Sequence, residues 1–128
     1  MNNVNKKKHK LLIVEDDYLH QKIYNKIFSP DFEVMLCKND YEFNEAINKS
    51  LFEICIIDLA LINSEDGIKL IKKLREKEEY KNTPIVVVTS YALKRDERVS
   101  LEAGATAFLT KPINIEILLE EVNKYINL

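Results

Sequence analysis

Five polar residues that could act on a phosphoryl group each lie at or just beyond the end of a short apolar run. They are Glu15, Asp16, Asp58, Thr89 and Lys111. Carboxylates that are brought together repel one another and need a compensating cation. Their hard oxygen atoms suit Mg²⁺, while the lysine adds a positive charge and the threonine a hydroxyl donor. A carboxylate nucleophile, a divalent cation, a lysine and a hydroxyl are the parts that phosphoryl transfer requires.

Each of these residues, taken singly, also has an ordinary structural interpretation. The acidic triplet 15–17 is typical of a solvated loop or a helix cap, and an isolated Asp58 is typical of a turn. Thr89 would be a β-branched strand residue, and Lys111 a surface lysine before a proline. The functional interpretation therefore depends on a fold that brings these side chains together.

The elements that must position them are indicated by apolar runs that alternate with amphipathic stretches. Runs rich in Ile, Val and Leu are typical of strands whose sheet is covered by helices on both faces. Five strands alternating with five helices predict an α/β fold with a doubly wound parallel sheet. The predicted strands are Leu11–Val14, Phe32–Cys37, Ile54–Leu59, Ile85–Val88 and Ala107–Leu109, and the predicted helices include Tyr18–Phe28, Gly67–Glu78 and Lys94–Ala103.

The ends of the helices are marked by capping residues. Asn39 can cap the second helix, with Glu42 three residues on as its return partner. Asn114 can cap the last helix, and Gly104 ends the fourth. In such sheets ligands bind beyond the carboxyl ends of the strands. If the strand order is 2-1-3-4-5, the first and third strands are neighbours, and the acidic residues that follow them meet at one edge.

Composition sets limits on the class of protein. The chain has 128 residues, which suits one domain, and its formal net charge of -2 argues against a nucleic-acid-binding domain. No apolar stretch reaches the roughly 18–20 residues that span a bilayer. We therefore expect a cytoplasmic protein without membrane contact, in which Cys37 and Cys55 are small core residues. We expect residues 1–9 to be a disordered or frayed tail.

Four motifs stand in a fixed order along the chain: LLIVEDD at 11–17, IIDLAL at 56–61, VVVTS at 86–90 and FLTKP at 108–112. As a set, they resemble the receiver domains of two-component response regulators, and the resemblance covers residues 10–128. It implies a flavodoxin-like fold. It also implies that the domain accepts a phosphoryl group from a histidine kinase or histidine phosphotransfer protein and then changes conformation to control binding of a downstream protein target.

The resemblance also implies a role for each matching residue. Asp58 would be the phosphoacceptor and a ligand of Mg²⁺. Asp16 would bind the metal directly and Glu15 through water, while the main-chain carbonyl of Ala60 would be a further ligand. On this basis we expect a signalling phosphoacceptor that catalyses its own phosphorylation and dephosphorylation with Mg²⁺, and not an enzyme.

The resemblance further implies that Thr89 and Lys111 act with Asp58 in the phosphoryl chemistry, and that Thr89 and Phe108 form a conformational switch. Thr89 would hydrogen-bond a phosphoryl oxygen and Lys111 would pair with the phosphoryl group. Phe108 matches the aromatic position that rotates when the hydroxyl at Thr89 moves inward, and a cis peptide is expected before Pro112. One departure concerns the loop after Asp58, which is one residue longer than usual up to Gly67, with Ile62 where proline is common.

Other functions fit the sequence less well. Only Gly67 and Gly104 occur, which excludes the glycine-rich phosphate loops of Rossmann and P-loop proteins. The acidic triplet would repel the phosphate of a flavodoxin-type cofactor, and Ala60 stands where a haloacid dehalogenase needs a second aspartate. The alternative that stays open is an interaction module that keeps this fold without a working switch. His9 and His20 have no acidic partner at a recognisable spacing, and we expect His20 to be exposed.

Overall fold

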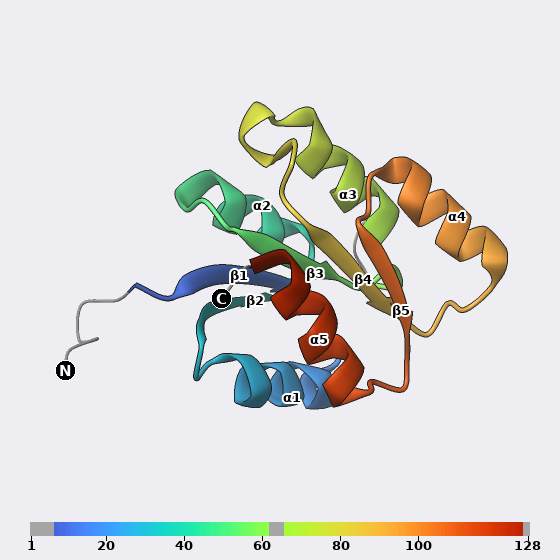
Figure 1. Ribbon diagram of the computed structural model, residues 1–128. Coiled ribbons are helices and arrows are strands. Elements are labelled where there is room, and N and C mark those ends of the chain that lie inside the picture. The colour runs from blue at the N-terminus through green and yellow to red at the C-terminus, as the bar shows by residue number, and fades with distance from the viewer. Residues whose placement is uncertain (1–6, 62–65, 127–128) are drawn as a thin grey trace.

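Five parallel strands form one sheet in the order β2-β1-β3-β4-β5, as Figure 1 shows for the computed structural model. The structure describes residues 7–61 and 66–126. The observed order confirms the predicted 2-1-3-4-5 arrangement. The strands are β1 (His9–Val14), β2 (Phe32–Cys37), β3 (Ile54–Ile57), β4 (Ile85–Thr89) and β5 (Ala107–Thr110).

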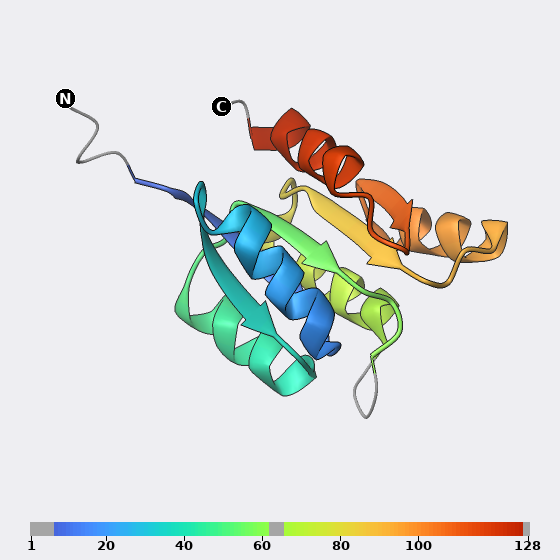
Figure 2. The ribbon, with the colours of Figure 1, turned by 90° about the horizontal axis from the view of Figure 1, so that it is seen from below.

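Helices cover both faces of this sheet, which confirms the doubly wound fold. Figures 1 and 2 show α1 and α5 on one face, with α2, α3 and α4 on the other. The bounds are α1 (Tyr18–Phe28), α2 (Asp40–Lys49), α3 (Gly67–Glu76), α4 (Lys94–Ala103) and α5 (Ile115–Ile126), and a short 3₁₀ turn, η1 (Glu78–Tyr80), follows α3.

The core is divided into two layers by the sheet, because successive side chains of a strand point to opposite faces. Leu12 and Val14 of β1 pack with the buried residues of α2 and α3. Leu11 and Ile13 of the same strand pack with those of α1 and α5. All four are fully buried, which explains why residues 11–14 of β1 are a continuous apolar run rather than an alternating one.

Capping residues lie at the starts and ends of helices where the sequence predicts them. The Oδ1 atom of Asn39 accepts the N–H of Glu42 at 2.8 Å, and the Glu42 carboxylate accepts the N–H of Lys38 at 2.8 Å, one residue before the cap. Asn114 caps α5 by accepting the N–H of Ile117 at 3.0 Å. Gly104 follows α4 with φ 124°, a conformation that glycine adopts readily.

Arg75 connects α3 to the turn that follows α4. Its guanidinium Nε and Nη2 donate to the carbonyl of Gly104 at 2.9 and 2.7 Å, and its Nη1 donates to the carbonyls of Tyr80 and Thr83, each at 2.7 Å. Arginine suits this place because its planar group presents several donors in a fixed geometry. The contacts hold the C-terminal end of α4 against the segment between α3 and β4.

The boundaries differ from the sequence prediction by one or two residues. β3 ends at Ile57, two residues before the end of the predicted run, while β4 and β5 each extend one residue further than predicted. Cys37 and Cys55 are buried free thiols, as expected. Ile62, in the lengthened loop after Asp58, lies outside the described residues. Among the helices of the described chain, none combines the length and apolar character needed to cross a membrane.

Candidate functional site

Three of the predicted residues meet at the carboxyl ends of the strands, at one edge of the sheet. Glu15 follows β1, Asp58 follows β3 and Lys111 follows β5. The ammonium of Lys111 donates to Oε1 of Glu15 at 2.8 Å and to Oδ2 of Asp58 at 2.9 Å. The topology causes this meeting, because β1 and β3 are neighbours and all strands run in the same direction.

The two carboxylates are almost completely buried. Glu15 is 1% exposed and Asp58 is 5% exposed. The second oxygen of each carboxylate accepts a backbone hydrogen bond at 3.0 Å, Glu15 from the N–H of Asp17 and Asp58 from that of Ala60. These donors fix the orientation of both groups, as the low exposure requires, since buried charges need partners.

The electrostatics of the site are those of two acids that share one cation. Burial raises the pKa of Glu15 above its ordinary value, and the charge of Asp58 adds to this rise, although the hydrogen bonds from Lys111 and the Asp17 backbone oppose it. For Lys111, burial lowers the pKa, but the bonds to both carboxylates outweigh burial and leave the pKa raised. The lysine is therefore charged over the physiological range, and the site carries an excess of negative charge.

Gly67 lets the start of α3 approach the backbone of Asp58. A Cβ atom at this position would lie 2.3 Å from the Asp58 carbonyl oxygen and 2.8 Å from the Cα of Leu59. The N–H of Gly67 donates to the Leu59 carbonyl at 3.0 Å, and Asp66 caps the helix by accepting the N–H of Lys69 at 3.1 Å. The helix therefore supports the segment that carries Asp58.

Thr89 lies at the end of β4 and is fully buried. Its Oγ1 accepts the N–H of Tyr91 at 3.2 Å, so the hydroxyl keeps its own hydrogen for donation. Phe108 on β5 is part-buried and packs against the core layer on the α2–α4 side. The peptide between Lys111 and Pro112 is cis, as expected.

Of the four predicted metal ligands, Glu15 and Asp58 are brought together through Lys111. Asp16, next to Glu15, and Ala60, next to Leu59, are both part-exposed. In residues 7–61 and 66–126, no three His, Cys, Asp or Glu side chains are grouped in a way that could hold a metal ion. Between Glu15 and Asp58, the positive charge is the ammonium of Lys111.

His20 belongs to the site, although the sequence prediction placed it elsewhere. Its Nδ1 atom lies 3.0 Å from Nζ of Lys111, 3.7 Å from Oε1 of Glu15 and 3.8 Å from Oδ1 of Asp17, and its side chain is 29% exposed. The prediction of an exposed histidine was therefore wrong, and two acidic side chains lie within 4 Å of its ring. The spacing of three residues from the helix cap Asp17 could have indicated an acidic neighbour, but not the contact with Lys111.

Two further contacts went unpredicted. His9 pairs through Nδ1 with Oε2 of Glu53 at the opposite end of β1, so it also has an acidic partner. Gln21 donates from its side-chain amide to the main-chain carbonyl of Glu15. The second contact fixes the first turn of α1 beside the acidic cluster.

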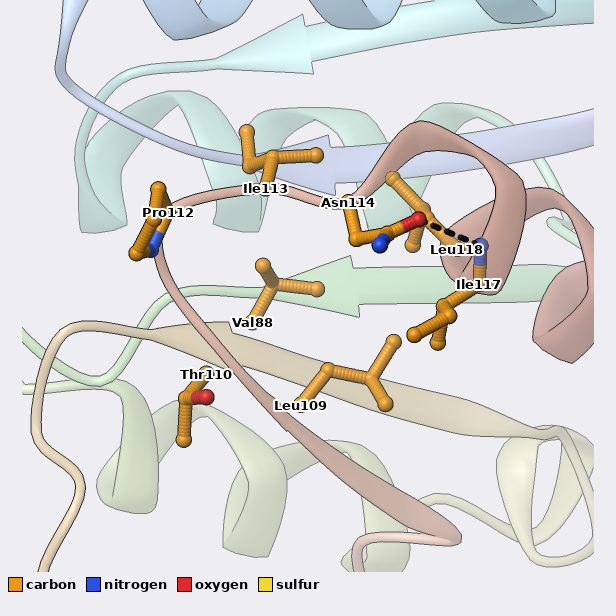
Figure 3. A pocket seen from close by; sticks show the side chains of 8 residues that line it. All are labelled: Val88, Leu109, Thr110, Pro112, Ile113, Asn114, Ile117 and Leu118. Carbon is orange, nitrogen blue, oxygen red and sulfur yellow. Dashed lines mark hydrogen bonds between the residues drawn. The ribbon is translucent and has the colours of Figure 1, made fainter.

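A separate pocket lies between the ends of β4 and β5 and the start of α5. Figure 3 shows the side chains that line it, including Pro112 and Asn114. None of its lining residues belongs to the cluster of Glu15, Asp58 and Lys111. The chemistry of the site is thus carried by the cluster and not by this pocket.

Comparison with known proteins places the chain in a family. Residues 11–123 match the model of the response regulator receiver domain. The chain is 30% identical over 125 residues to hybrid signal transduction histidine kinase I of Dictyostelium discoideum, covering 91% of this chain and only 7% of that protein. It is 25% identical over 117 residues to the polar-differentiation response regulator DivK of Brucella anthropi, covering 91% of this chain and 94% of that protein.

Solved structures show the same fold. A putative response regulator from Chloroflexus aurantiacus is 28% identical with a TM-score of 0.87, and the match covers 95% of this chain and 100% of that one. The receiver domain of a sensor histidine kinase from Pseudomonas aeruginosa, described with a magnesium ion coordinated in its active-site cleft, is 23% identical with a TM-score of 0.83, covering 94% and 99%. At that identity, the second likeness shows the fold alone.

The family match corrects one expectation. From the sequence we expected that the chain is not an enzyme. The matched family consists of phosphoacceptor receiver domains, and a buried carboxylate hydrogen-bonded to a lysine is a reactive arrangement of the kind that enzymes use. The prediction that the chain is not an enzyme was therefore wrong.

Proposed function

The chain belongs to the response regulator receiver domain family of two-component systems, and on that premise we propose that Asp58 accepts a phosphoryl group. The donor would be a histidine kinase or a histidine phosphotransfer protein. One observation carries the assignment of Asp58: its carboxylate is buried at the end of a central strand and is oriented by Lys111 at 2.9 Å and by the Ala60 N–H at 3.0 Å.

The chemistry follows from this arrangement. A carboxylate oxygen of Asp58 forms the new O–P bond as the N–P bond of the donor's phosphohistidine breaks. The electron pair of the broken bond stays on the imidazole nitrogen, which takes up a proton. Lys111 neutralises charge on the phosphoryl oxygens, and the hydroxyl of Thr89 donates a hydrogen bond to one of them.

The charge of the site and its oxygen donors suit a magnesium ion, although the described acidic side chains are not grouped around a metal position. Two buried carboxylates share the single charge of Lys111, and the charge of Asp58 helps to raise the pKa of Glu15, so the site has negative charge that a divalent cation would balance. We propose that Glu15, Asp16, Asp58 and the carbonyl of Ala60 hold the ion, since Mg²⁺ prefers such hard oxygen ligands. When bound, it would neutralise charge on the transferring phosphoryl group.

Phosphorylation would change the surface that partners contact. Thr89 and Phe108 lie at neighbouring strands, with Thr89 paired to Thr110 and Val87 paired to Phe108 in the β4–β5 register. We propose that inward movement of the Thr89 hydroxyl lets the Phe108 ring rotate, which rearranges the face of α4, β5 and α5 for a downstream protein. The extent of the domain, residues 10–128 after a tail at 1–9, stays a prediction, although β1 already begins at His9. A cytoplasmic location also stays a prediction.

Titration with beryllofluoride and Mg²⁺, followed by amide NMR, tests this proposal. Asp58→Asn removes the acceptor charge, while Asp66→Asn is the matched control, because asparagine also caps a helix. We expect Mg²⁺-dependent shifts of the Thr89 and Phe108 amides in the wild type and in Asp66→Asn, and none in Asp58→Asn. No response of the folded wild type, or an equal response of Asp58→Asn, would contradict the proposal.

A further inference from the structure

The imidazole of His20 contacts the ammonium of Lys111 on the side of α1. Its Nδ1 atom lies 3.0 Å from Nζ, close to the 2.8 and 2.9 Å that separate Nζ from Glu15 and Asp58. The ring is held in place by the first turn of α1, where the backbone N–H of His20 donates to the capping carboxylate of Asp17 at 3.0 Å. The histidine therefore belongs to a fixed set of contacts around the lysine.

The chemistry of the two groups decides the direction of this hydrogen bond. A lysine ammonium has three hydrogens and no acceptor, and lysine is ordinarily protonated at neutral pH. Its three hydrogens match three acceptors: Oε1 of Glu15, Oδ2 of Asp58 and Nδ1 of His20. The Nδ1 atom must then carry no proton, and the neutral ring carries its proton on Nε2.

We propose that His20 is a positioning residue for Lys111. It accepts the third hydrogen of the ammonium and so holds the charge between Glu15 and Asp58, where it can meet the phosphoryl group. The inference rests on the proposed function of Asp58 and extends it to a residue in another element. His20 does not touch the reacting carboxylate in this arrangement, and it acts through the lysine.

The size of the effect follows from what the lysine loses. The ammonium sits on a flexible four-carbon stem, so without His20 its third hydrogen turns to solvent and the charge spends less time beside Asp58. One hydrogen bond of this kind corresponds to a change of between about two- and tenfold in rate. The affinity for a phosphodonor depends on other groups and is expected to change little.

Two substitutions separate the acceptor from the side-chain volume. In His20→Asn the amide oxygen takes the place of Nδ1, at the same number of bonds from the backbone, and keeps an acceptor. In His20→Leu a methyl group takes that place and cannot accept a hydrogen bond from Lys111. His9→Leu is the matched control, because it removes a histidine with an acidic partner, Glu53, at the opposite end of β1.

The rate of phosphorylation by phosphoramidate with Mg²⁺, followed by intact mass, gives the first readout. We expect His20→Leu to lower the maximal rate by between about two- and tenfold, with little change in the half-saturating donor concentration. His20→Asn and His9→Leu should stay close to the wild type. An unchanged rate in His20→Leu, or an equal loss in His20→Asn with the fold intact, would overturn the inference.

The tautomer of His20 gives a second readout that needs no phosphorylation. Long-range ¹H–¹⁵N spectra of the neutral ring should show the proton on Nε2 and a bare Nδ1, and Lys111→Met should shift the Nδ1 resonance towards that of an imidazole nitrogen without a hydrogen bond. A proton on Nδ1 in the wild type would overturn the inference and leave Asp58 as acceptor. A wild type that phosphoramidate does not modify would instead overturn the proposed function together with the role of His20.

Discussion

Replacement of Lys111 by methionine removes the ammonium that two buried acids share and keeps a side chain of similar length. The broken contacts are the 2.8 Å bond to Glu15, the 2.9 Å bond to Asp58 and the 3.0 Å bond to His20. The lysine side chain is 10% exposed, and those of the acids are 1% and 6% exposed, so solvent screens these contacts little. Each carboxylate would keep a hydrogen bond from a neutral backbone donor, Asp17 or Ala60, and Glu15 would keep the His20 ring 3.7 Å away.

The expected cost is that of leaving a buried charge without its partner. Removal of one member of a buried ion pair costs about 3–5 kcal/mol, and we expect a loss of this size in the free energy of unfolding at neutral pH. Because Lys111 now lowers the pKa of Glu15, that pKa should rise further in the variant. Stability linked to a raised carboxyl pKa is present below the unfolded-state pKa and is lost as the pH rises through the folded-state pKa. The variant should therefore approach the wild type in acid and fall behind it towards neutral pH.

Urea unfolding followed by circular dichroism at several pH values measures this difference. The double variant Lys111→Met/Glu15→Gln is the internal control, because neutralising one acid should recover a large part of the loss. A loss below about 1 kcal/mol at neutral pH, in the range of an exposed ion pair, would refute the reasoning. A loss that does not depend on pH would refute it as well.

Three further substitutions test the packing around the site by urea unfolding. Gly67→Ala should cost about 1–3 kcal/mol, since its Cβ would lie 2.3 Å from the Asp58 carbonyl oxygen, and a neutral result would mean that α3 can shift. Tyr24→Phe should be neutral or stabilising, because the buried Tyr24 hydroxyl has no hydrogen-bond partner in the described part of the chain; a clear loss would argue against this. Arg75→Met should cost about 2–3 kcal/mol and speed hydrogen exchange near Gly104, and unchanged exchange would count against the proposed anchoring of α4.

Most of the fold could be predicted from the sequence because its signals are local. The apolar runs identify the strands, and the caps Asn39 and Asn114 form as their spacing predicts. The end of β3 was predicted two residues late, because Asp58 and Leu59 are buried without belonging to the strand. Burial is what an apolar pattern reports, and it does not by itself show where sheet hydrogen bonding ends.

The site was predictable only in part, for a related reason. Glu15, Asp58 and Lys111 could be placed together because each follows a strand of one parallel sheet. His20 could not, since its partner Lys111 is 91 positions away and the contact depends on how α1 is rotated about its axis. The acidic residues also predict that a cation balances their charge. Which cation does so, here the ammonium of Lys111, depends on the assembled site.

The most direct test of the account is to find the residue that carries the phosphoryl group. The protein would be incubated with phosphoramidate and Mg²⁺, the acyl phosphate reduced with borohydride, and the peptides mapped by mass spectrometry. The account predicts that the residue reduced to homoserine is Asp58, and that Asp58→Asn gains no phosphoryl group. Modification of a different residue, or equal modification of Asp58→Asn, would contradict it.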